Sequence, residues 1–310
     1  MRIFLAGATG AVGTPLLKQL IAAGHTVTAT TRSAAKVERL RQAGAAVVIL
    51  DGLDGAAVGE AVARAEPDAI IHQMTALSAT PDLKHFDSWF AATNALRTRG
   101  LDHLLAAALS LGVPRLIAQS YTGWTNPREG GPVKTEADPL DPDPAPAQRR
   151  TLAAIRYLEQ AVTQAPLTGI ALRYGNLYGP GASDDMVKLV GKRMFPIIGS
   201  GAGVWSWLHV EDAAAAAVAA LEHGASGVYN IADDDPAPVA EWLPHLARAI
   251  GAPPPLRVPP WLGRLMAGEA AARWMIEGRG AANAKAKRDL GFRPAWPSWR
   301  EGFRRLGTPK

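Results

Sequence analysis

Three stretches of this sequence carry residues whose types and spacing suit chemistry on a bound organic ligand. Residues 7–13 read GATGAVG, a glycine-rich turn of the kind that brings bare main chain against phosphates. Ser120 and Tyr121 place two hydroxyl groups next to each other, and a tyrosine can give or take a proton at a reacting oxygen. Further polar and aromatic candidates lie in the second half of the chain: Tyr174, Asn176, Tyr178, Trp207 and His209.

The glycine turn lies between a strand pattern and a helix pattern. Residues 2–6 are mostly apolar, as in a strand buried in a parallel sheet, and residues 14–23 repeat apolar side chains at helical spacing. In such a unit the glycines allow a tight turn, close approach to a pyrophosphate, and close packing of helix on strand. Free N–H groups at the helix start favour the phosphates. The alternative is a glycine-rich connection that binds nothing. The predicted dinucleotide contacts are Gly7, Thr9, Gly10, Ala11, Val12 and Gly13.

Arg32 bears on which dinucleotide is bound. It directly follows residues 26–31, a β-branched run typical of a strand. An NAD-preferring site carries an acidic residue about 20 positions after the glycine turn to hold the ribose 2′-hydroxyl, and no acid stands here. The planar guanidinium of Arg32 suits a 2′-phosphate instead. The sequence therefore favours NADP(H), with NAD still possible. Alternatively, Arg32 is only the solvated start of a helix over residues 34–42.

Two later strand ends add candidate cofactor contacts. Residues 46–50 and 68–72 read as the third and fourth strands, and ligands bind at the carboxyl edge of such sheets. Asp51 could accept a hydrogen bond from an adenine amino group, or an acid here could cap the following helix. The candidates at these strand ends are Asp51, Gly52, Leu53, Gln73 and Thr75.

Composition excludes several classes of site. The 310-residue chain is 48% hydrophobic, has a formal net charge of +5 and contains no cysteine, which excludes disulfides and thiolate chemistry. The seven histidines lack metal-ligand spacing, so we expect no metal. No basic run is interleaved with aromatics, no apolar stretch is long enough for a membrane span, and no signal-peptide pattern is present. We expect a cytoplasmic protein with a small-molecule substrate and no nucleic-acid or membrane partner.

The order of patterns predicts the fold class. Strands over residues 115–119 and 169–173 alternate with helices, which is typical of an α/β protein with a Rossmann-like, doubly wound parallel sheet. A proline-rich loop over residues 123–148 is long enough to suggest function. After residue 180 the alternation stops. We therefore predict an NAD(P)-binding domain at 1–180 plus 205–235, and a smaller, mostly helical C-terminal substrate lobe at 181–204 plus 236–310.

Several blocks of sequence together resemble one enzyme family. The chain is similar to the extended short-chain dehydrogenases/reductases, of the NAD(P)-dependent sugar epimerase/dehydratase type. The matching blocks are GATGAVG at 7–13, LIAQS at 116–120, LRYGNLYGPG at 172–181, WLHVEDAA at 207–214, VYNIADD at 228–234 and KAKRDLGFRP at 285–294. The resemblance implies a nicotinamide cofactor on a Rossmann-like sheet and a smaller lobe closing over the substrate. It also implies pairing through the central helices, so a homodimer is possible.

The catalytic motif of that family is altered in this chain. The family uses Tyr-x-x-x-Lys on the helix before the sixth strand, with a Ser or Thr after the fifth. Aligning Glu159 with the family's glutamate puts Thr151 at the tyrosine position and Ile155 at the lysine position. Tyr121 falls about where the family's Ser or Thr would be, so we predict Tyr121 as a relocated acid/base with Ser120 beside it.

The reading of Tyr121 has alternatives. Tyr121 could pack without transferring a proton, or a substrate group or water could supply the proton while Ser120 and Tyr121 only orient a carbonyl. A third possibility is a non-catalytic dinucleotide-binding redox sensor or scaffold.

The remaining candidates are assigned by their place after the sixth strand. By resemblance this segment borders the nicotinamide, so Tyr174 is a cofactor candidate. Asn176, Tyr178, Trp207 and His209 are substrate candidates; Asn176 could instead be a turn residue, and the aromatics could instead pack in a core. Taken together, the sequence predicts an atypical NADP(H)-preferring oxidoreductase or epimerase. It would act on the carbonyl or hydroxyl carbon of a small polar or nucleotide-sugar-like substrate.

Overall fold

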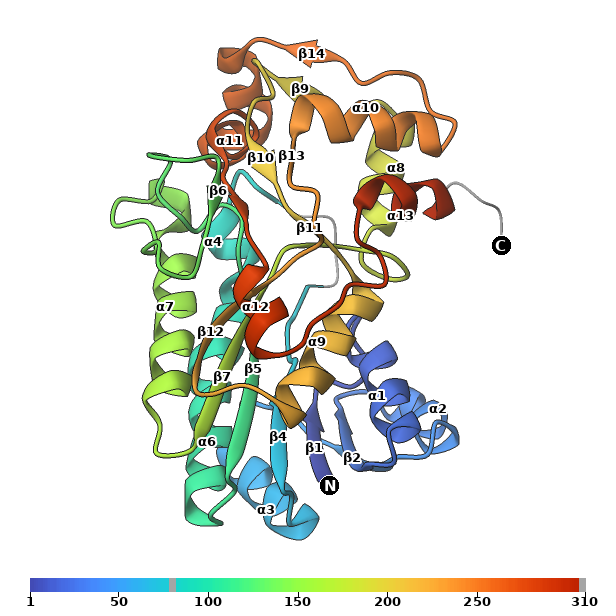
Figure 1. Ribbon diagram of the computed structural model, residues 1–310, viewed down its shortest axis with the longest axis vertical. Helices are drawn as coiled ribbons and strands as arrows, with labels where there is room; N and C mark the ends of the chain where they lie inside the picture. Colours follow the sequence, from blue (N-terminus) through green and yellow to red (C-terminus); the bar gives the residue numbers. More distant parts are fainter. Residues whose placement is uncertain (78–81, 307–310) are drawn as a thin grey trace.

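A seven-stranded parallel sheet forms the centre of the molecule. A computed structural model describes residues 1–77 and 82–306 (Figure 1). The strands lie in the order β12-β7-β5-β4-β1-β2-β3, and each neighbouring pair is parallel. The order reverses at β1, which confirms the predicted Rossmann-like, doubly wound fold. The strands are β1 (Arg2–Ala6), β2 (Thr26–Thr31), β3 (Ala46–Ile49), β4 (Ala69–His72), β5 (Arg115–Tyr121), β7 (Thr168–Tyr174) and β12 (Gly227–Ile231).

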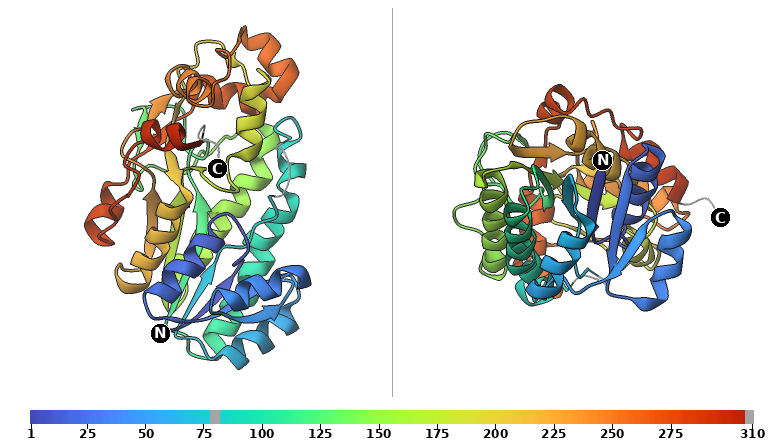
Figure 2. Two further views of the ribbon diagram at one scale, coloured as in Figure 1. Left: turned by 90° about the vertical axis from the view of Figure 1, so that its right-hand side faces the viewer. Right: turned by 90° about the horizontal axis from the view of Figure 1, so that it is seen from below.

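Helices cover both faces of the sheet (Figures 1 and 2). One apolar core joins the sheet to α1, α2 and α9, and a second joins its other face to α3, α6 and α7. Alternate strand residues enter opposite cores, as with Ile117 and Leu116 of β5, because side chains alternate across a strand. The helices are α1 (Gly13–Ala22), α2 (Val37–Gln42), α3 (Gly55–Ala65), α6 (Leu101–Ser110), α7 (Arg149–Gln164) and α9 (Val210–Glu222).

The central helix is not uniform. The sequence predicts one helix over about residues 90–112, and the structure divides it into α4 (Phe86–Trp89), α5 (Ala91–Ala95), a π-helical turn (Leu96–Gly100) and α6. The wider turn carries Arg97. Its charged side chain is buried, in a helix whose other residues are largely apolar. Single π-helical turns are rare and are frequent at functional sites.

A smaller lobe lies above the carboxyl edge of the sheet (Figure 1). It has its own apolar core, with Trp207, Trp242, Trp299 and Phe303 almost fully buried. Among the described residues, no helix is long and apolar enough to cross a membrane. The helices of the lobe are α8 (Asp184–Gly191), α10 (Val239–Ala249), α11 (Pro260–Glu277) and α13 (Trp299–Leu306). Its short strands are β8 (Asn176–Tyr178), β9 (Ile197–Ile198), β10 (Val204–Trp205), β11 (Trp207–His209), β13 (Ala237–Pro238) and β14 (Arg257–Val258).

Packing departs from the predicted boundaries between the two parts. The helix α12 (Ala284–Asp289) was expected in the C-terminal lobe, but Ala286 and Leu290 belong to the core on the sheet. Conversely, Tyr178 and Trp207 were expected with the sheet and lie in the core of the lobe. Apolar side chains decide which of the two cores each segment joins. The composition of the sequence alone does not show where the chain passes from one core to the other.

The long loop over residues 123–148 is held in place by a strand from a distant part of the chain. Its short strand β6 (Val133–Lys134) pairs with β15 (Gly280–Ala281), and the Asp141 amide donates to the Thr125 carbonyl at 2.8 Å. The strand pairing holds the loop against the connection that follows α11, and the Asp141–Thr125 bond closes the loop on itself.

Candidate active site

The glycine turn after β1 has the shape of a phosphate cradle. Gly7 has φ of +94°, and a Cβ there would lie 2.7 Å from the Gln73 carbonyl carbon. A Cβ at Gly13 would lie 2.1 Å from the Gly7 carbonyl oxygen, so both positions require glycine for packing. Gly10 differs: it is exposed, and the nearest atom to a Cβ there would be 3.6 Å away. Its bare main chain therefore leaves room for a ligand, as the motif requires.

The start of α1 faces this cradle without a side-chain cap. No side chain caps the helix at Val12, and its first turn holds no acidic residue. N–H groups at a helix start and the positive end of its dipole attract phosphates. Gly181, from the segment entering the lobe, lies close by: a Cβ there would be 3.9 Å from the Ala11 side chain. The predicted contacts Thr9, Ala11 and Val12 thus lie where the two parts of the molecule meet.

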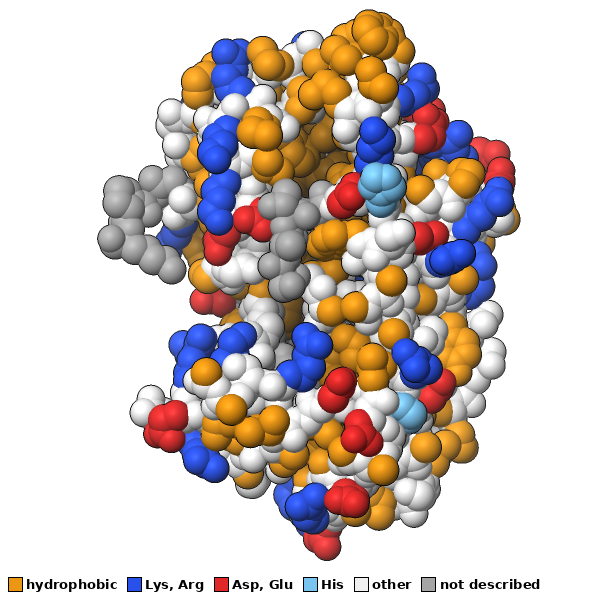
Figure 3. Space-filling view, turned by 180° about the vertical axis from the view of Figure 1, so that it is seen from behind, with side chains coloured by type: hydrophobic (Ala, Val, Ile, Leu, Met, Phe, Trp, Pro, Cys, Tyr) orange, Lys and Arg blue, Asp and Glu red, His pale blue; other side chains and the backbone are white. Residues whose placement is uncertain are grey.

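Basic side chains surround a pocket next to the turn. Arg32 is exposed at the end of β2 and has no hydrogen bond or ion pair with the residues that the structure describes. Lys36 and Arg39 line a shallow pocket together with Thr9 and Lys18. The space-filling view shows Lys and Arg side chains gathered below a recess in the molecule (Figure 3). An anionic group would find uncompensated positive charge here.

Two acidic residues follow β3, and they take different roles. The Asp51 carboxylate accepts a bond from the Leu53 amide at 3.0 Å, which folds the turn locally. Asp54 is the acid that caps α3, accepting from the Ala57 amide at 3.1 Å. Gly52 is buried, and a Cβ there would meet the Met74 sulfur at 2.5 Å. Asp51 is exposed and is not the helix cap, so its adenine role stays a prediction.

Gln73 and Tyr174 are bonded to each other beside the glycine turn. The Gln73 amide donates to the Tyr174 hydroxyl at 3.1 Å, and that hydroxyl donates to the Ala213 carbonyl of α9 at 3.2 Å. Burial raises the pKa of Tyr174 well above its ordinary value of 10, so the phenol keeps its proton. The Gln73 side-chain oxygen is buried without a partner, which leaves one acceptor free for a ligand donor. Thr75 follows, half-buried.

Thr151 and Ile155 stand where the resemblance predicts the family's tyrosine and lysine. The Thr151 hydroxyl donates to Asp87 at 2.6 Å and accepts from the Asn94 amide at 3.0 Å. Asp87 also accepts from the Thr151 main-chain amide, which ties it to the start of α7. Ile155 is buried in the apolar interior. Thr151 is therefore committed to a structural network, and no cation stands at position 155.

Tyr121 lies at the end of β5 with its hydroxyl fixed. The hydroxyl donates to the Asn176 side-chain oxygen at 2.8 Å, and the Asn176 amide donates to the Ser206 carbonyl at 3.1 Å. Burial raises the pKa of Tyr121 well above its ordinary value of 10. Near neutral pH this side chain is thus a neutral phenol, able to donate a hydrogen bond but not to act as a base.

Arg97 is a buried cation close to Tyr121, and the sequence analysis missed it. It lies in the π-helical turn, donates to the Asn94 side-chain oxygen at 3.3 Å and has its guanidinium 5.8 Å from the Phe90 ring centre. Burial lowers its pKa to about 10, so it stays charged near neutral pH. Its charge acts on Tyr121, lowering the phenol's pKa against the larger effect of burial. The available signal was an arginine at helical spacing from Asn94.

Ser120 faces away from Tyr121. Its hydroxyl donates to the Glu159 carboxylate at 2.7 Å, and Glu159 forms a buried, two-bonded pair with Arg173 at 2.7 and 2.6 Å. Successive strand residues point to opposite faces of a sheet, so the two hydroxyls do not converge on one oxygen. The expectation that they act together is not met, and the structure gives Ser120 a place in an interior network.

Two predicted substrate contacts are packed inside the lobe. Tyr178 and Trp207 are at most 1% exposed and touch Phe303, so neither offers surface to a ligand in this structure. The alternative of core packing is favoured for both. His209 is also buried; its ring nitrogen accepts from the Glu211 amide at 3.3 Å and caps α9, and burial lowers its pKa. Asn176, in contrast, lies directly against Tyr121.

A second pocket adjoins Tyr121, and its residues were not singled out from the sequence. Trp124 and Trp274 line it, with ring centres 6.2 and 6.5 Å from the Tyr121 ring. A Cβ at Gly123, another lining residue, would lie 2.7 Å from the Tyr121 hydroxyl. The two tryptophans come from distant parts of the chain, so no sequence spacing could connect them.

Comparison with known proteins identifies the family of the chain. The model of the NAD dependent epimerase/dehydratase family matches residues 3–232. A 3-diazoavenalumate denitrifying reductase of a Streptomyces species is 44% identical over 98% of this chain and all of that protein. A 2-alkyl-3-oxoalkanoate reductase of Stenotrophomonas maltophilia is 28% identical over 82% of this chain and 77% of that protein. The UDP-glucose 4-epimerase of Thermotoga maritima, solved with UDP-glucose, superposes with a TM-score of 0.75 at 23% identity, covering 98% and 96% of the chains. The chain belongs to the NAD-dependent epimerase/dehydratase family and is an enzyme of its oxidoreductase and epimerase type.

Proposed function

We propose that this enzyme is an NADP(H)-preferring reductase that replaces the cationic aryldiazonium group of a small carboxylate substrate by hydrogen. The observation that carries the proposal is that Thr151 is bonded to Asp87 and Ile155 is buried, at the two positions where the resemblance predicts a tyrosine and a lysine. Among the similar proteins, a reductase at 44% identity is named for the reductive removal of nitrogen from a diazo compound. Such a reaction needs no protein acid or base.

The balance of atoms and electrons explains why the reaction needs no protein acid or base. A bound reduced nicotinamide supplies hydride. The hydride's electron pair forms the new bond to hydrogen, the electrons of the old carbon–nitrogen bond leave with N₂, and no proton enters or leaves. The chain's residues then only have to bind, orient and exclude water. The neutral, hydrogen-bonded Tyr121 fits that passive role.

A carbonyl group is the second candidate acceptor, and Arg97 favours it. Hydride addition to a carbonyl creates an oxyanion, which a nearby cation and a phenol donor stabilise. Arg97 and Tyr121 offer that combination, and one relative is named as a reductase of an oxoalkanoate. An epimerase acting on a nucleotide-sugar-like substrate is the third possibility, supported by the fold it shares with the family.

The cofactor preference rests on the basic pocket. Lys36 and Arg39 line that pocket next to the glycine turn, and Arg32 stands exposed at the end of β2. A ribose 2′-phosphate needs positive charge at this edge of the sheet. No acidic residue follows β2 to hold an unmodified 2′-hydroxyl. We infer that NADPH binds more tightly than NADH.

One experiment separates these candidates. The purified protein is mixed with NADPH and either 4-carboxybenzenediazonium, acetoacetate or UDP-glucose, with no-protein controls for direct reaction of the diazonium salt. The proposal predicts protein-dependent NADPH oxidation with the diazonium compound only. Oxidation with acetoacetate instead would support the carbonyl candidate. Interconversion of UDP-glucose without net oxidation would support an epimerase.

A further inference from the structure

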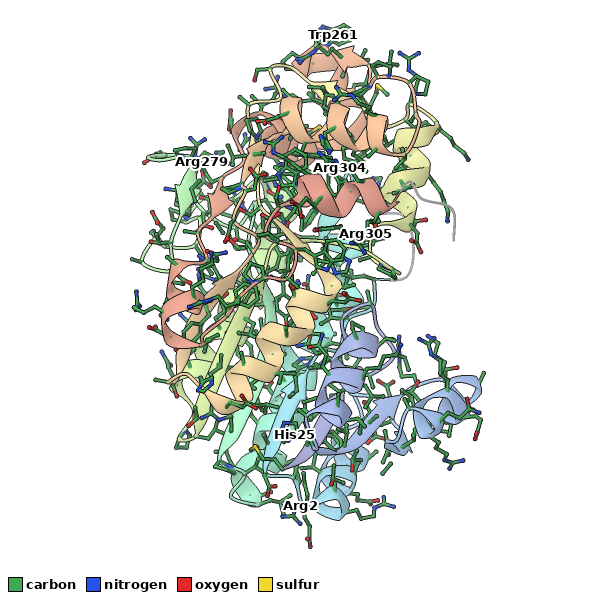
Figure 4. The ribbon with its side chains drawn as sticks, turned by 45° about the vertical axis from the view of Figure 1, so that its right-hand side comes forward. Arg2, His25, Trp261, Arg279, Arg304 and Arg305 are labelled. Atoms are coloured by element: carbon green, nitrogen blue, oxygen red, sulfur yellow. The ribbon has the colours of Figure 1, made fainter. Side chains whose placement is uncertain are left out.

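Large apolar side chains are exposed at the far end of the small lobe. Trp261 and Leu265 are each 65% exposed, the highest values among the large hydrophobic residues that the structure describes, and Met266 is 59% exposed. These three belong to the first half of α11, and Leu256, next to β14, is 47% exposed. Figure 4 shows Trp261 at the extreme end of the molecule, where Figure 1 places β14 and α11. We call these four residues the apolar tip.

The first half of α11 is held by its inner side, so its outer side chains are not needed for the core. Gly263 is buried, and a Cβ there would lie 2.4 Å from Cγ2 of Ile198 in β9. Ala267 packs against the core of the lobe, whereas none of the four tip residues, all of which the structure describes, is part of that core. The helix then breaks at Gly268, which has φ of +87°. Clusters of exposed large apolar side chains mark contacts with proteins or membranes.

The chain that forms the tip carries positive charge and no negative charge. Residues 242–268 contain no aspartate or glutamate. Arg248, Arg257 and Arg264 lie in this stretch, and all three are exposed. Arg264 lies 2.9 Å from Glu269, whereas Arg248 and Arg257 have no ion pair among the residues that the structure describes. An anionic partner would therefore meet attractive charge around an apolar centre.

This combination fits the surface of an anionic lipid bilayer. Tryptophan favours the boundary between water and hydrocarbon, where its ring is amphipathic, and arginine is attracted to anionic headgroups. A second copy of the chain would instead bring another basic surface, free of acids, against the first, and like charges that face each other are unfavourable. The position of Trp261 at an end of the molecule, rather than in a hollow, also suits a broad flat partner (Figure 4).

We propose that the apolar tip docks the protein reversibly on anionic lipid membranes, with Trp261 and Leu265 at the interface and Arg257 against the headgroups. The proposal goes beyond the proposed function and does not depend on it. The expectation of no membrane partner rested on the lack of an apolar stretch long enough to span a bilayer, and contact with the surface of a bilayer requires no such stretch.

The test is flotation of the full chain with lipid vesicles. The vesicles contain phosphatidylcholine alone, or equal parts of phosphatidylcholine and phosphatidylglycerol. We expect binding to the anionic vesicles only, and weaker binding as salt is added, because salt screens exposed charges. Arg257→Gln should weaken binding about fivefold, the factor that one basic residue contributes near an anionic surface. Leu265→Ser should weaken it about tenfold, because its exposed apolar surface would otherwise leave water.

Two matched controls alter exposed side chains of the same types at the other end of the molecule. They are Arg64→Gln in α3 and Leu109→Ser in α6. Both should bind anionic vesicles like the unaltered chain. Urea unfolding should give nearly the same stability for all four variants, because surface substitutions usually change it by no more than about 0.5 kcal/mol.

Several results would overturn the proposal. They are no flotation with the anionic vesicles, equal flotation with both kinds of vesicle, and losses in the control variants as large as those in the tip variants. Sedimentation velocity without vesicles tests the other occupant. Self-association that Leu265→Ser abolishes, without any vesicle binding by the unaltered chain, would also refute the membrane contact and assign the tip to a second copy.

Discussion

The Tyr121 hydroxyl donates a 2.8 Å hydrogen bond to the side-chain oxygen of Asn176, across the ends of β5 and β8. The bond fixes the direction of the phenol's proton, and burial keeps that proton in place near neutral pH. Tyr121 is therefore held as a donor beside the pocket of Trp124 and Trp274. Whether the reaction uses that proton decides between the two reductase candidates.

Tyr121→Phe is the variant that makes the distinction. If nitrogen is lost by hydride transfer alone, turnover should fall by less than about tenfold, because no proton is moved. Carbonyl reduction would instead lose about 10²–10⁴-fold, as expected when an acid is removed. Turnover is measured as NADPH oxidation with each acceptor. Tyr157→Phe, which removes an exposed hydroxyl bonded to Asp102, is the control and should be neutral in both assays.

Gly10→Ala tests the close approach of a dinucleotide to the turn. The structure has room for a Cβ at Gly10, so the free energy of unfolding should change by no more than about 0.5 kcal/mol. The added methyl group would fill space that the phosphates need, and NADPH affinity should fall at least tenfold. Gly59→Ala, in open space on α3, is the control and should stabilise by about 0.5–1 kcal/mol without changing affinity. Unaltered NADPH binding by Gly10→Ala would contradict the claim that this turn holds the phosphates.

Arg32→Ala tests the cofactor preference. Losing a guanidinium that pairs with a 2′-phosphate should weaken NADPH binding by about 10–100-fold and leave NADH binding nearly unchanged. Arg41→Ala removes an exposed arginine near the end of α2, away from the end of β2, and it should leave both affinities unchanged. Fluorescence titration with each dinucleotide gives the affinity of each of the two variants relative to the unaltered chain. Equal losses for NADPH and NADH would refute the role of Arg32.

His72 predicts a pH dependence of stability. Burial lowers its pKa from 6.5 to about 4; Nε2 bonds to the Leu96 carbonyl at 3.2 Å, and Nδ1 accepts from the Met74 amide at 3.1 Å. The folded state favours the neutral ring, so this contribution is complete above pH 6.5 and lost as pH falls toward 4. Between about pH 7 and pH 5 the unaltered chain should lose about 1–2 kcal/mol more than His72→Gln. Urea unfolding at the two pH values measures the difference, and parallel losses would exclude His72 as the cause.

The sequence predicted the sheet well because its signals are local. The strands β1, β2 and β12 begin and end where the apolar and β-branched runs do, and the glycine turn has the expected form. Each depends on residues adjacent in the chain. The alternation of strands and helices then leaves few possible topologies.

The candidate site was harder to predict because it depends on contacts between distant residues. Nothing in the sequence shows that Ser120 is bonded to Glu159, or that Tyr178 and Trp207 are enclosed by α13. Arg97 was missed for the same reason. Its importance comes from burial without a carboxylate partner among the described residues, which only the folded chain shows. The spacing of the aromatic residues along β11 is equally compatible with lining a cleft and with packing in a core.

The central claim is that the chain binds NADPH at its glycine turn and reduces its substrate without a protein acid–base pair. The most direct measurement follows NADPH oxidation and N₂ release together, with 4-carboxybenzenediazonium as acceptor, in the unaltered protein and in Tyr121→Phe. The account predicts one N₂ for each NADPH oxidised, dependence on the protein, and nearly equal rates in the two proteins. NADPH oxidation without N₂ release, or no protein-dependent oxidation at all, would contradict it.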